Sequence, residues 1–516
     1  MKSFLVGVVG CLISASLLAA APPAPVFRAG AATSNITPPL GGGIIGGFIP
    51  FPATHVHDEL HARCLVLDDG HVKLALVVCD LLGLDDRLSV EARRLIQQDP
   101  GIPPEHVLIS AVHTHSASSA LGRDRFKHSQ ELSDYQRFVA RRIADGVKCA
   151  ANGLRPAQVA FVTAEAPEHV FNRRWFLKPG TIPPNPFGAT DRVQMNPPAG
   201  SPNLVEPAGP TDPTVSILSL REPNGRPIAV FAAYSLHYVG GVRGADISAD
   251  YYGMFCRFLE RLLGAEDQDP PFVAMMANGT SGDVNNISFR QPRPGKEPYA
   301  QMRFVAQDVA GKVRAALAKA AYRDRVTLAA RYREPMIACR RPSPEQIQRA
   351  KQVLAGPAPQ PGKVDLPYVY AQRTISMAEC PEAIPVPLQV LRIGDACIGT
   401  MPAEVFCEIG LEFRKRSPVQ PAFLISLAHG YFGYLPTPRQ HALGGYETWL
   451  GTSRLEPQAS DKMLHALLEM AAEIRSPGTK ARAPTGDKLP PVKVASVRRV
   501  FHNGEHNAFT DERHDR

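Results

Sequence analysis

The sequence has no Cys-x-x-Cys pair, no basic cluster interleaved with aromatic residues and, after residue 21, no apolar run long enough to cross a membrane. These absences argue against a thiolate-held metal cluster, against a single-strand or RNA-binding surface, and against a membrane span in the rest of the chain. The net charge of +8 is spread along the sequence among many acidic residues, which indicates a solvated surface. We therefore expect no nucleic-acid partner.

The first 21 residues have the pattern of a secretory signal. Lys2 is followed by an apolar run that extends to Leu18, and three alanines, residues 19–21, come next. This pattern predicts a signal peptide at residues 1–21 and a protein that is secreted or periplasmic. A lipoprotein anchored at Cys11 is the less favoured alternative, because the apolar run continues well past that cysteine.

Apolar runs of strand length alternate with amphipathic segments of helix length over most of the chain. We expect an α/β domain at residues 27–476, with a mixed β-sheet core flanked by helices. Residues 477–516 are expected to form a linker and tail, or the stub of another module. The main predicted strands are 63–67, 72–79, 107–112, 214–220, 227–236, 272–277, 397–401 and 422–427, and the main predicted helices are 86–97, 133–152, 251–263, 300–320 and 406–415.

Two histidines follow the predicted strand at 107–112, in the run His113-Thr114-His115-Ser116. In an extended segment residues i and i+2 point to the same side, so both imidazoles can face one cavity. Neutral imidazole is a common zinc ligand. Taken alone, the pair is as consistent with a satisfied structural pair as with a metal or catalytic site.

Two further candidate ligands stand at the ends of other predicted strands. His237 follows the apolar segment 229–233 and is the natural third imidazole. Glu404 leaves a turn at Pro402 and enters the predicted helix at 406–415. A carboxylate there is either an oxygen ligand for a metal or a charge at the helix N-terminus, and its local sequence favours the helix-cap interpretation.

The order and setting of these segments resemble the catalytic domain of the neutral ceramidase family, whose members cleave the amide of N-acylsphingosines. The resemblance covers residues 28 to about 449 and depends on several dispersed matches. The His113 run is similar to the family's His-Thr-His-Ser-Gly, which implies His113 as a zinc ligand and His115 as a polar group at the substrate. His237 is similar to the second zinc histidine, and Glu404 to the acidic ligand.

Three more segments carry the resemblance. Tyr434, in Gly433-Tyr434-Leu435-Pro436-Thr437, is similar to the tyrosine that completes the family's metal shell. Tyr446 resembles the tyrosine that faces the scissile amide, and Arg173 resembles the arginine of the family's Asn-Arg-Ser. The resemblance therefore implies Zn²⁺ held by His113, His237, Glu404 and Tyr434, with His115, Arg173 and Tyr446 as catalytic residues.

One position departs from the family pattern. The segment 272–286 aligns without gaps with the family's segment ending Gly-Asp-Val-Ser-Pro-Asn, and Asn285 stands where the family has its catalytic serine. An amide cannot act as an alkoxide nucleophile, although it can donate a hydrogen bond to an oxyanion, so Asn285 stays among the catalytic candidates. Ser281, four residues earlier, is a candidate substitute nucleophile, but a turn serine more often forms a hydrogen bond with the backbone, and we favour that interpretation.

The resemblance implies a secreted, zinc-dependent amidohydrolase of lipid or sphingolipid metabolism that cleaves the linear amide of a ceramide-like, N-acylated substrate with metal-activated water. The alternatives are a zinc hydrolase acting on another acyl amide or an ester, and a catalytically retired homologue that binds a ligand, which Asn285 motivates. The expected partner is a small-molecule or lipid N-acyl substrate, and peripheral contact with a membrane surface stays open. We expect the chain to lack the family's C-terminal β domain.

Overall fold

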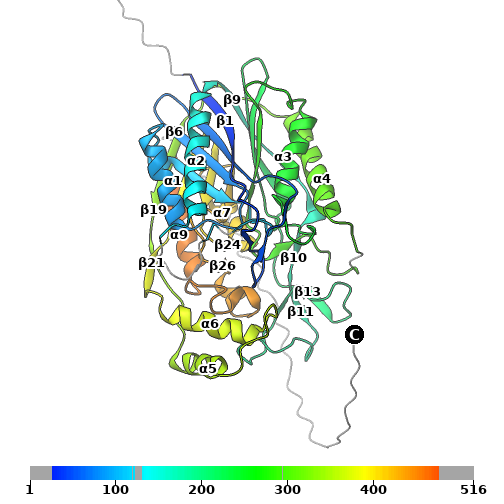
Figure 1. Ribbon diagram of the computed structural model, residues 1–516. Helices are drawn as coiled ribbons and strands as arrows, with labels where there is room; N and C mark the ends of the chain where they lie inside the picture. Colours follow the sequence, from blue (N-terminus) through cyan, green and yellow to red (C-terminus); the bar gives the residue numbers. More distant parts are fainter. Residues whose placement is uncertain (1–25, 119, 122–130, 293–294, 476–516) are drawn as a thin grey trace, which may run out of the picture. The chain divides into compact units, whose positions relative to one another are not determined.

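Two β-sheets lie face to face between two pairs of helices in the computed structural model, which describes residues 26–118, 120–121, 131–292 and 295–475 (Figure 1). The first sheet has the order β7-β6-β5-β1-β8 and the second the order β17-β15-β14-β9. The predicted signal peptide at residues 1–21, with Cys11, and the predicted tail at 477–516 lie outside the described residues. The strands are β1 (Arg28–Asn35), β5 (His61–Asp68), β6 (Lys73–Cys79), β7 (Val107–Ala111), β8 (Arg155–Pro156), β9 (Gln158–Glu165), β14 (Thr214–Arg221), β15 (Pro227–Tyr234) and β17 (Val273–Asn278).

The central strands of this sandwich are apolar on both faces because both faces are covered. On β5, Leu65 and Leu67 pack into the core between the two sheets, whereas Cys64 and Val66 pack into a second core beneath the helices. Period-2 alternation therefore divides one apolar run between two cores. The helices that cover the first sheet are α1 (Asp86–Gln98) and α2 (Asp134–Asn152), and those that cover the second are α3 (Asp250–Leu262) and α4 (Ala300–Leu317).

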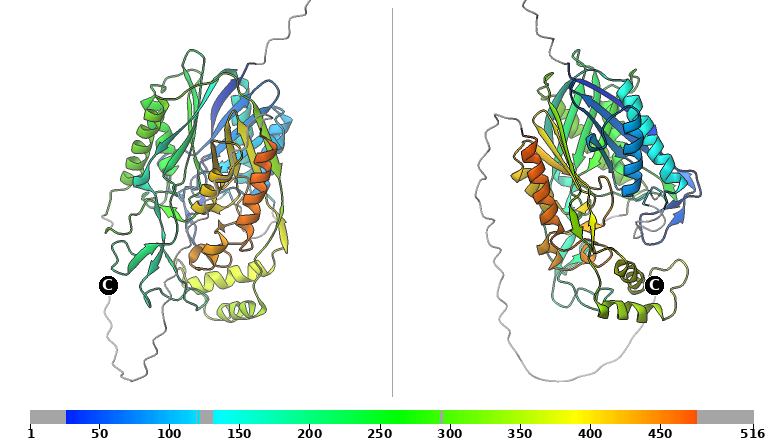
Figure 2. Two further views of the ribbon diagram at one scale, coloured as in Figure 1. Left: turned by 180° about the vertical axis from the view of Figure 1, so that it is seen from behind. Right: turned by 90° about the vertical axis from the view of Figure 1, so that its left-hand side faces the viewer.

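A third sheet, with the order β19-β22-β23-β25, has its own apolar core against α7 (Cys407–Arg416) and α9 (Ala459–Glu473). Its strands are β19 (Leu328–Arg333), β22 (Leu388–Ile393), β23 (Ala396–Thr400) and β25 (Ala422–Ile425). The helices α5 (Pro344–Leu354) and α6 (Leu366–Ala378) pack on each other beyond one end of the sheets (Figure 2). Sequence patterning alone did not predict α6 or α9.

The expectation of a mixed β-sheet core flanked by helices is confirmed, since the sheets combine parallel and antiparallel pairs. Among the described helices, none is both long and apolar enough to cross a membrane. No disulfide joins any of the eight cysteines in the described ranges.

Three parallel strand pairs bring distant segments to one place. These pairs are β6/β7, β15/β17 and β23/β25, and a candidate site residue follows each of them. The carboxyl ends of parallel strands open onto a common crevice, where ligands bind in open α/β sheets. Backbone hydrogen bonds from Ala111 to Leu427 (3.1 Å) and from Ser426 to Asn278 (3.0 Å) join the ends of the three sheets.

Candidate functional site

His113 is held in an unusual backbone conformation at the end of β7. The strand ends at Ala111, and His113 has a φ of 75°, in the left-handed region. This conformation costs a non-glycine residue about 1–2 kcal/mol. The prediction of an extended backbone through the His113 run is therefore wrong. In the observed conformation the His113 backbone N–H donates to Leu81 O (2.9 Å). The rings of His113 and His115 nevertheless lie together, with their Nε2 atoms 3.1 Å apart.

The rings of His113 and His237 are oriented by backbone carbonyl groups. Nδ1 of His113 lies 2.7 Å from Leu82 O, and Nδ1 of His237 lies 3.1 Å from Ser281 O. We assign the ring proton to Nδ1 in both residues, because a carbonyl oxygen can only accept. Each Nε2 then keeps a lone pair, as is typical of histidines that bind metal.

Glu404 faces both histidines. Its Oε2 lies 3.2 Å from His113 Nε2 and 3.7 Å from His237 Nε2, and its Oε1 accepts a hydrogen bond from the Tyr431 hydroxyl (2.6 Å). The helix-cap interpretation is wrong, because α7 begins at Cys407 after an N-cap at Phe406 with no side-chain cap. Burial by itself raises the pKa of Glu404, whereas positive charge on the facing histidines, when they are protonated, and the hydrogen bond from the Tyr431 hydroxyl lower that pKa.

These three side chains have the donor set of a divalent metal site. His237 Nε2 and Glu404 Oε2 are both buried and lack a hydrogen-bond partner among the described residues. Leaving such an atom unsatisfied costs about 1–3 kcal/mol, and two acceptor atoms that face each other can both be satisfied by one bound cation. Two imidazole nitrogens and a carboxylate oxygen are ligands that zinc accepts. The residues present therefore fit the implied metal.

Two tyrosines near Glu404 are candidates for a further oxygen ligand. Tyr434, on β26 (Tyr434–Leu435), is the register partner of Glu404 on β24 (Glu404–Val405) in a parallel pair, so both side chains leave the same face. Tyr431 is the one whose hydroxyl bonds Glu404. Sequence reasoning missed Tyr431, and the only available signal was its place three residues before Tyr434.

Arg173 is fixed by a fully buried carboxylate. Its Nε donates to Glu447 Oε1 (3.0 Å) and its Nη2 donates to Gly282 O (2.8 Å), while Arg174 donates to the other oxygen of Glu447 (2.7 Å). The guanidinium of Arg173 lies 5.3 Å from the centre of the Tyr434 ring and lines the same cavity as the histidines. Glu447 is a positioning residue that the sequence analysis did not single out.

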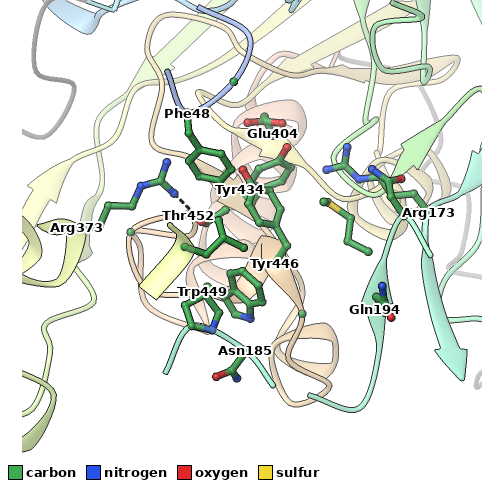
Figure 3. Close-up of a pocket in the computed structure, with 18 of the residues that line it drawn as sticks. Phe48, Arg173, Asn185, Gln194, Arg373, Glu404, Tyr434, Tyr446, Trp449 and Thr452 are labelled. Carbon is green, nitrogen blue, oxygen red and sulfur yellow. Dashed lines mark hydrogen bonds between the residues drawn. The ribbon is translucent and has the colours of Figure 1, made fainter. Parts of the chain in front are cut away.

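The cavity beside these residues has a volume of about 570 Å³, and its wall includes several aromatic rings. Tyr446 packs edge-on against Tyr434 and Phe48, with ring centres 5.8 and 6.4 Å apart (Figure 3). His115 lines the cavity and stacks on Tyr238 at 3.7 Å. Burial and the neighbouring His113 lower the pKa of His115 well below 6.5.

Asn285 and Ser281 are turned away from this cavity. The Asn285 amide donates to Asn196 Oδ1 (2.7 Å) and accepts from the Ile287 backbone N–H (2.9 Å), and Asn285 is not among the cavity-lining residues. Ser281 donates to Asn278 Oδ1 (2.8 Å) behind His237. The structure thus brings His113, His115, Arg173, His237, Glu404, Tyr434 and Tyr446 to one cavity and leaves Asn285 at its periphery.

No protein-family model matches this sequence. Solved structures that are similar to it over most of its length include two ceramidases. One is a ceramidase complexed with C2, with 17% sequence identity and a TM-score of 0.64 over 90% of this chain and 78% of that one. The other is the neutral ceramidase from Pseudomonas aeruginosa, with 18% identity and a TM-score of 0.63 over 89% of this chain and 76% of that one. At this level of identity the likeness concerns the fold, so the chain has the fold of the neutral ceramidases.

Proposed function

We propose that this protein is a zinc-dependent hydrolase that cleaves the amide bond of a linear N-acylated substrate. The observation that carries the proposal is the set of three facing, buried ligand atoms: His113 Nε2, His237 Nε2 and Glu404 Oε2. The likeness to a ceramidase complexed with C2 supports an N-acyl substrate, and a cavity with several aromatic rings in its wall suits an acyl chain.

Zinc, when bound by His113, His237 and Glu404 together with one of the nearby tyrosines, supplies a Lewis acid that lowers the pKa of water toward about 7. The chain's own residues perform the remaining tasks. Arg173, held by Glu447, adds positive charge at the cavity wall, where the acyl oxygen becomes negative.

Neutral His115 is the general base and acid in this proposal. It takes the proton of the attacking water and returns it to the departing nitrogen. The acyl carbon gains a C–O bond from that water and loses its C–N bond, which yields a carboxylic acid and an amine. Tyr446 packs against Phe48 and Tyr434 in the cavity wall, and we assign it the role of excluding bulk water from the reacting atoms.

The Asn285 side chain points away from the cavity. This orientation fits the water-based reaction, which needs no serine nucleophile at position 285. The catalytically retired, ligand-binding homologue is the competing proposal, since Asn285 replaces the family's serine.

Secretion or periplasmic location is also proposed, from the apolar leader at residues 1–21. Sequencing the N-terminus of the purified protein tests it.

Metal content and an acyl panel test the function. Purified protein should contain about one zinc per chain, and His237→Ala should lose it. The zinc-loaded protein should hydrolyse ceramides, short N-acyl amines or aryl esters, and His115→Ala should retain zinc while losing turnover. Full zinc occupancy with no hydrolysis across the panel would favour the retired homologue instead.

A further inference from the structure

Asn278 is a fully buried amide side chain beside the ends of the three sheets. It is the last residue of β17, and 0% of its surface is exposed. Its Nδ2 donates to Val112 O (2.9 Å) and to the Tyr252 hydroxyl (3.1 Å), and its Oδ1 accepts from the Ser281 hydroxyl (2.8 Å). The bond to Val112 O fixes the orientation of the amide, because a carbonyl oxygen can only accept. Both polar atoms of this side chain are therefore engaged.

The bonds of this amide lead to two of the candidate metal ligands. Val112 directly precedes His113, whose left-handed backbone persists only if the surrounding structure holds it. Tyr252, on α3, donates its hydroxyl proton onward to Leu236 O (3.0 Å), and Leu236 directly precedes His237. One side chain thus connects the backbone segments of both histidines.

The main chain at the same position leads to the third ligand. Asn278 O accepts a hydrogen bond from the Ser426 backbone N–H (3.0 Å). The next residue, Leu427, donates its backbone N–H to Ala403 O (3.1 Å), and Ala403 directly precedes Glu404. Asn278 is therefore linked to the residue before each of the three ligands, either directly or through one intervening segment.

The three ligand side chains lie close together, so their separation depends on the segments that carry them. The ring centres of His113 and His237 are 4.6 Å apart, and Glu404 Oε2 lies 3.2 and 3.7 Å from their Nε2 atoms. A metal site accepts ligand distances only within about 0.2 Å of the preferred values, so small movements of these segments change its affinity. Neither Asn278 nor Tyr252 lines the cavity. Any effect they have on a bound metal therefore passes through the ligands.

We propose that Asn278 is a positioning residue that sets the separation of the metal ligands, with Tyr252 as its link to His237. This inference rests on the metal site of the proposed function and adds residues that touch neither metal nor substrate. The competing explanation is purely structural, because a buried amide also satisfies backbone groups, and its loss then lowers stability alone. Metal affinity, measured apart from turnover, distinguishes the two explanations.

Two substitutions break the link, and a third is the matched control. Asn278→Asp exchanges the amide NH2 for an oxygen and cannot make both donated bonds, so the zinc Kd in a chelator competition should rise by about 10- to 100-fold. Tyr252→Phe removes only the hydroxyl between Asn278 and Leu236 and should raise the zinc Kd by about 10-fold. Tyr234→Phe removes a similarly buried hydroxyl that donates to Ala166 O. This control should lower the Tm as Tyr252→Phe does and leave the zinc Kd unchanged.

A Co²⁺ spectrum and a double variant give two further readouts. The visible absorption bands of bound Co²⁺ depend on the arrangement of its ligands, so they should shift in Asn278→Asp and Tyr252→Phe but not in Tyr234→Phe. Asn278 and Tyr252 act through one chain of hydrogen bonds. The double variant should therefore weaken zinc binding no more than Asn278→Asp does alone.

The outcomes separate this inference from the proposed function. If both variants match Tyr234→Phe in zinc Kd and in Co²⁺ spectrum, Asn278 only stabilises the fold, and the inference is overturned while the metal site and the hydrolase stand. If both variants weaken zinc binding but the zinc-loaded wild-type protein hydrolyses no acyl compound, the inference stands and the hydrolase is refuted. Wild-type protein that takes up neither metal overturns both. If Asn278→Asp fails to fold, Tyr252→Phe decides the question.

Discussion

Replacing Glu447 with glutamine removes the shared carboxylate that compensates Arg173 and Arg174. All three side chains are at least 95% buried, and the two contacts are 3.0 and 2.7 Å long. Removing one partner of a buried ion pair costs about 3–5 kcal/mol. We expect the lower end, about 3 kcal/mol, because Arg173 keeps Gly282 O and Arg174 keeps Gly444 O as acceptors.

Differential scanning fluorimetry measures this loss. With an unfolding entropy of about 2 cal/mol/K per residue, 3 kcal/mol lowers the Tm of a chain this size by about 3 °C. Turnover should also fall, because Arg173 loses its orientation. Glu473→Gln is the control, since Glu473 makes exposed pairs with Arg331 and Arg333 worth at most about 1 kcal/mol. A Tm for Glu447→Gln that matches that of the control would refute the claim that Glu447 compensates two buried charges.

Two further predictions concern other groups. Tyr431→Phe removes the hydroxyl that bonds Glu404 and should weaken zinc binding by at least about 10-fold in a chelator competition, so an unchanged affinity would exclude Tyr431 from the metal environment. Burial, Arg340 and Arg174 lower the pKa of His441 to about 3. Between pH 6.5 and about 3 the unfolded chain therefore binds a proton that the folded chain does not, so folding stability falls as pH falls through that window. His441→Gln should remove this contribution, and parallel plots of unfolding free energy against pH for the two proteins would contradict it.

Local patterning predicted much of the fold because each signal lies within a few residues. The apolar run that became β5 was recognisable, and its alternation between two cores follows from the period of a strand. The helices α6 and α9 were missed. Their pairing with α5 and with the third sheet involves contacts between elements, which local periodicity does not report.

Local pattern is enough to show which candidate ligands stand at the ends of buried strands, because an apolar run followed by a polar residue is recognisable within a few residues. What those residues do depends on which segments meet in the folded chain. From the sequence, Glu404 could cap a helix or face two histidines. It faces the histidines because the ends of three sheets lie together in the fold. The pairing of Glu447 with Arg173 likewise depends on segments far apart in the chain. Contacts between residues so far apart in the sequence arise when separate layers of the fold pack together. The spacing of residues along the chain does not reveal that packing.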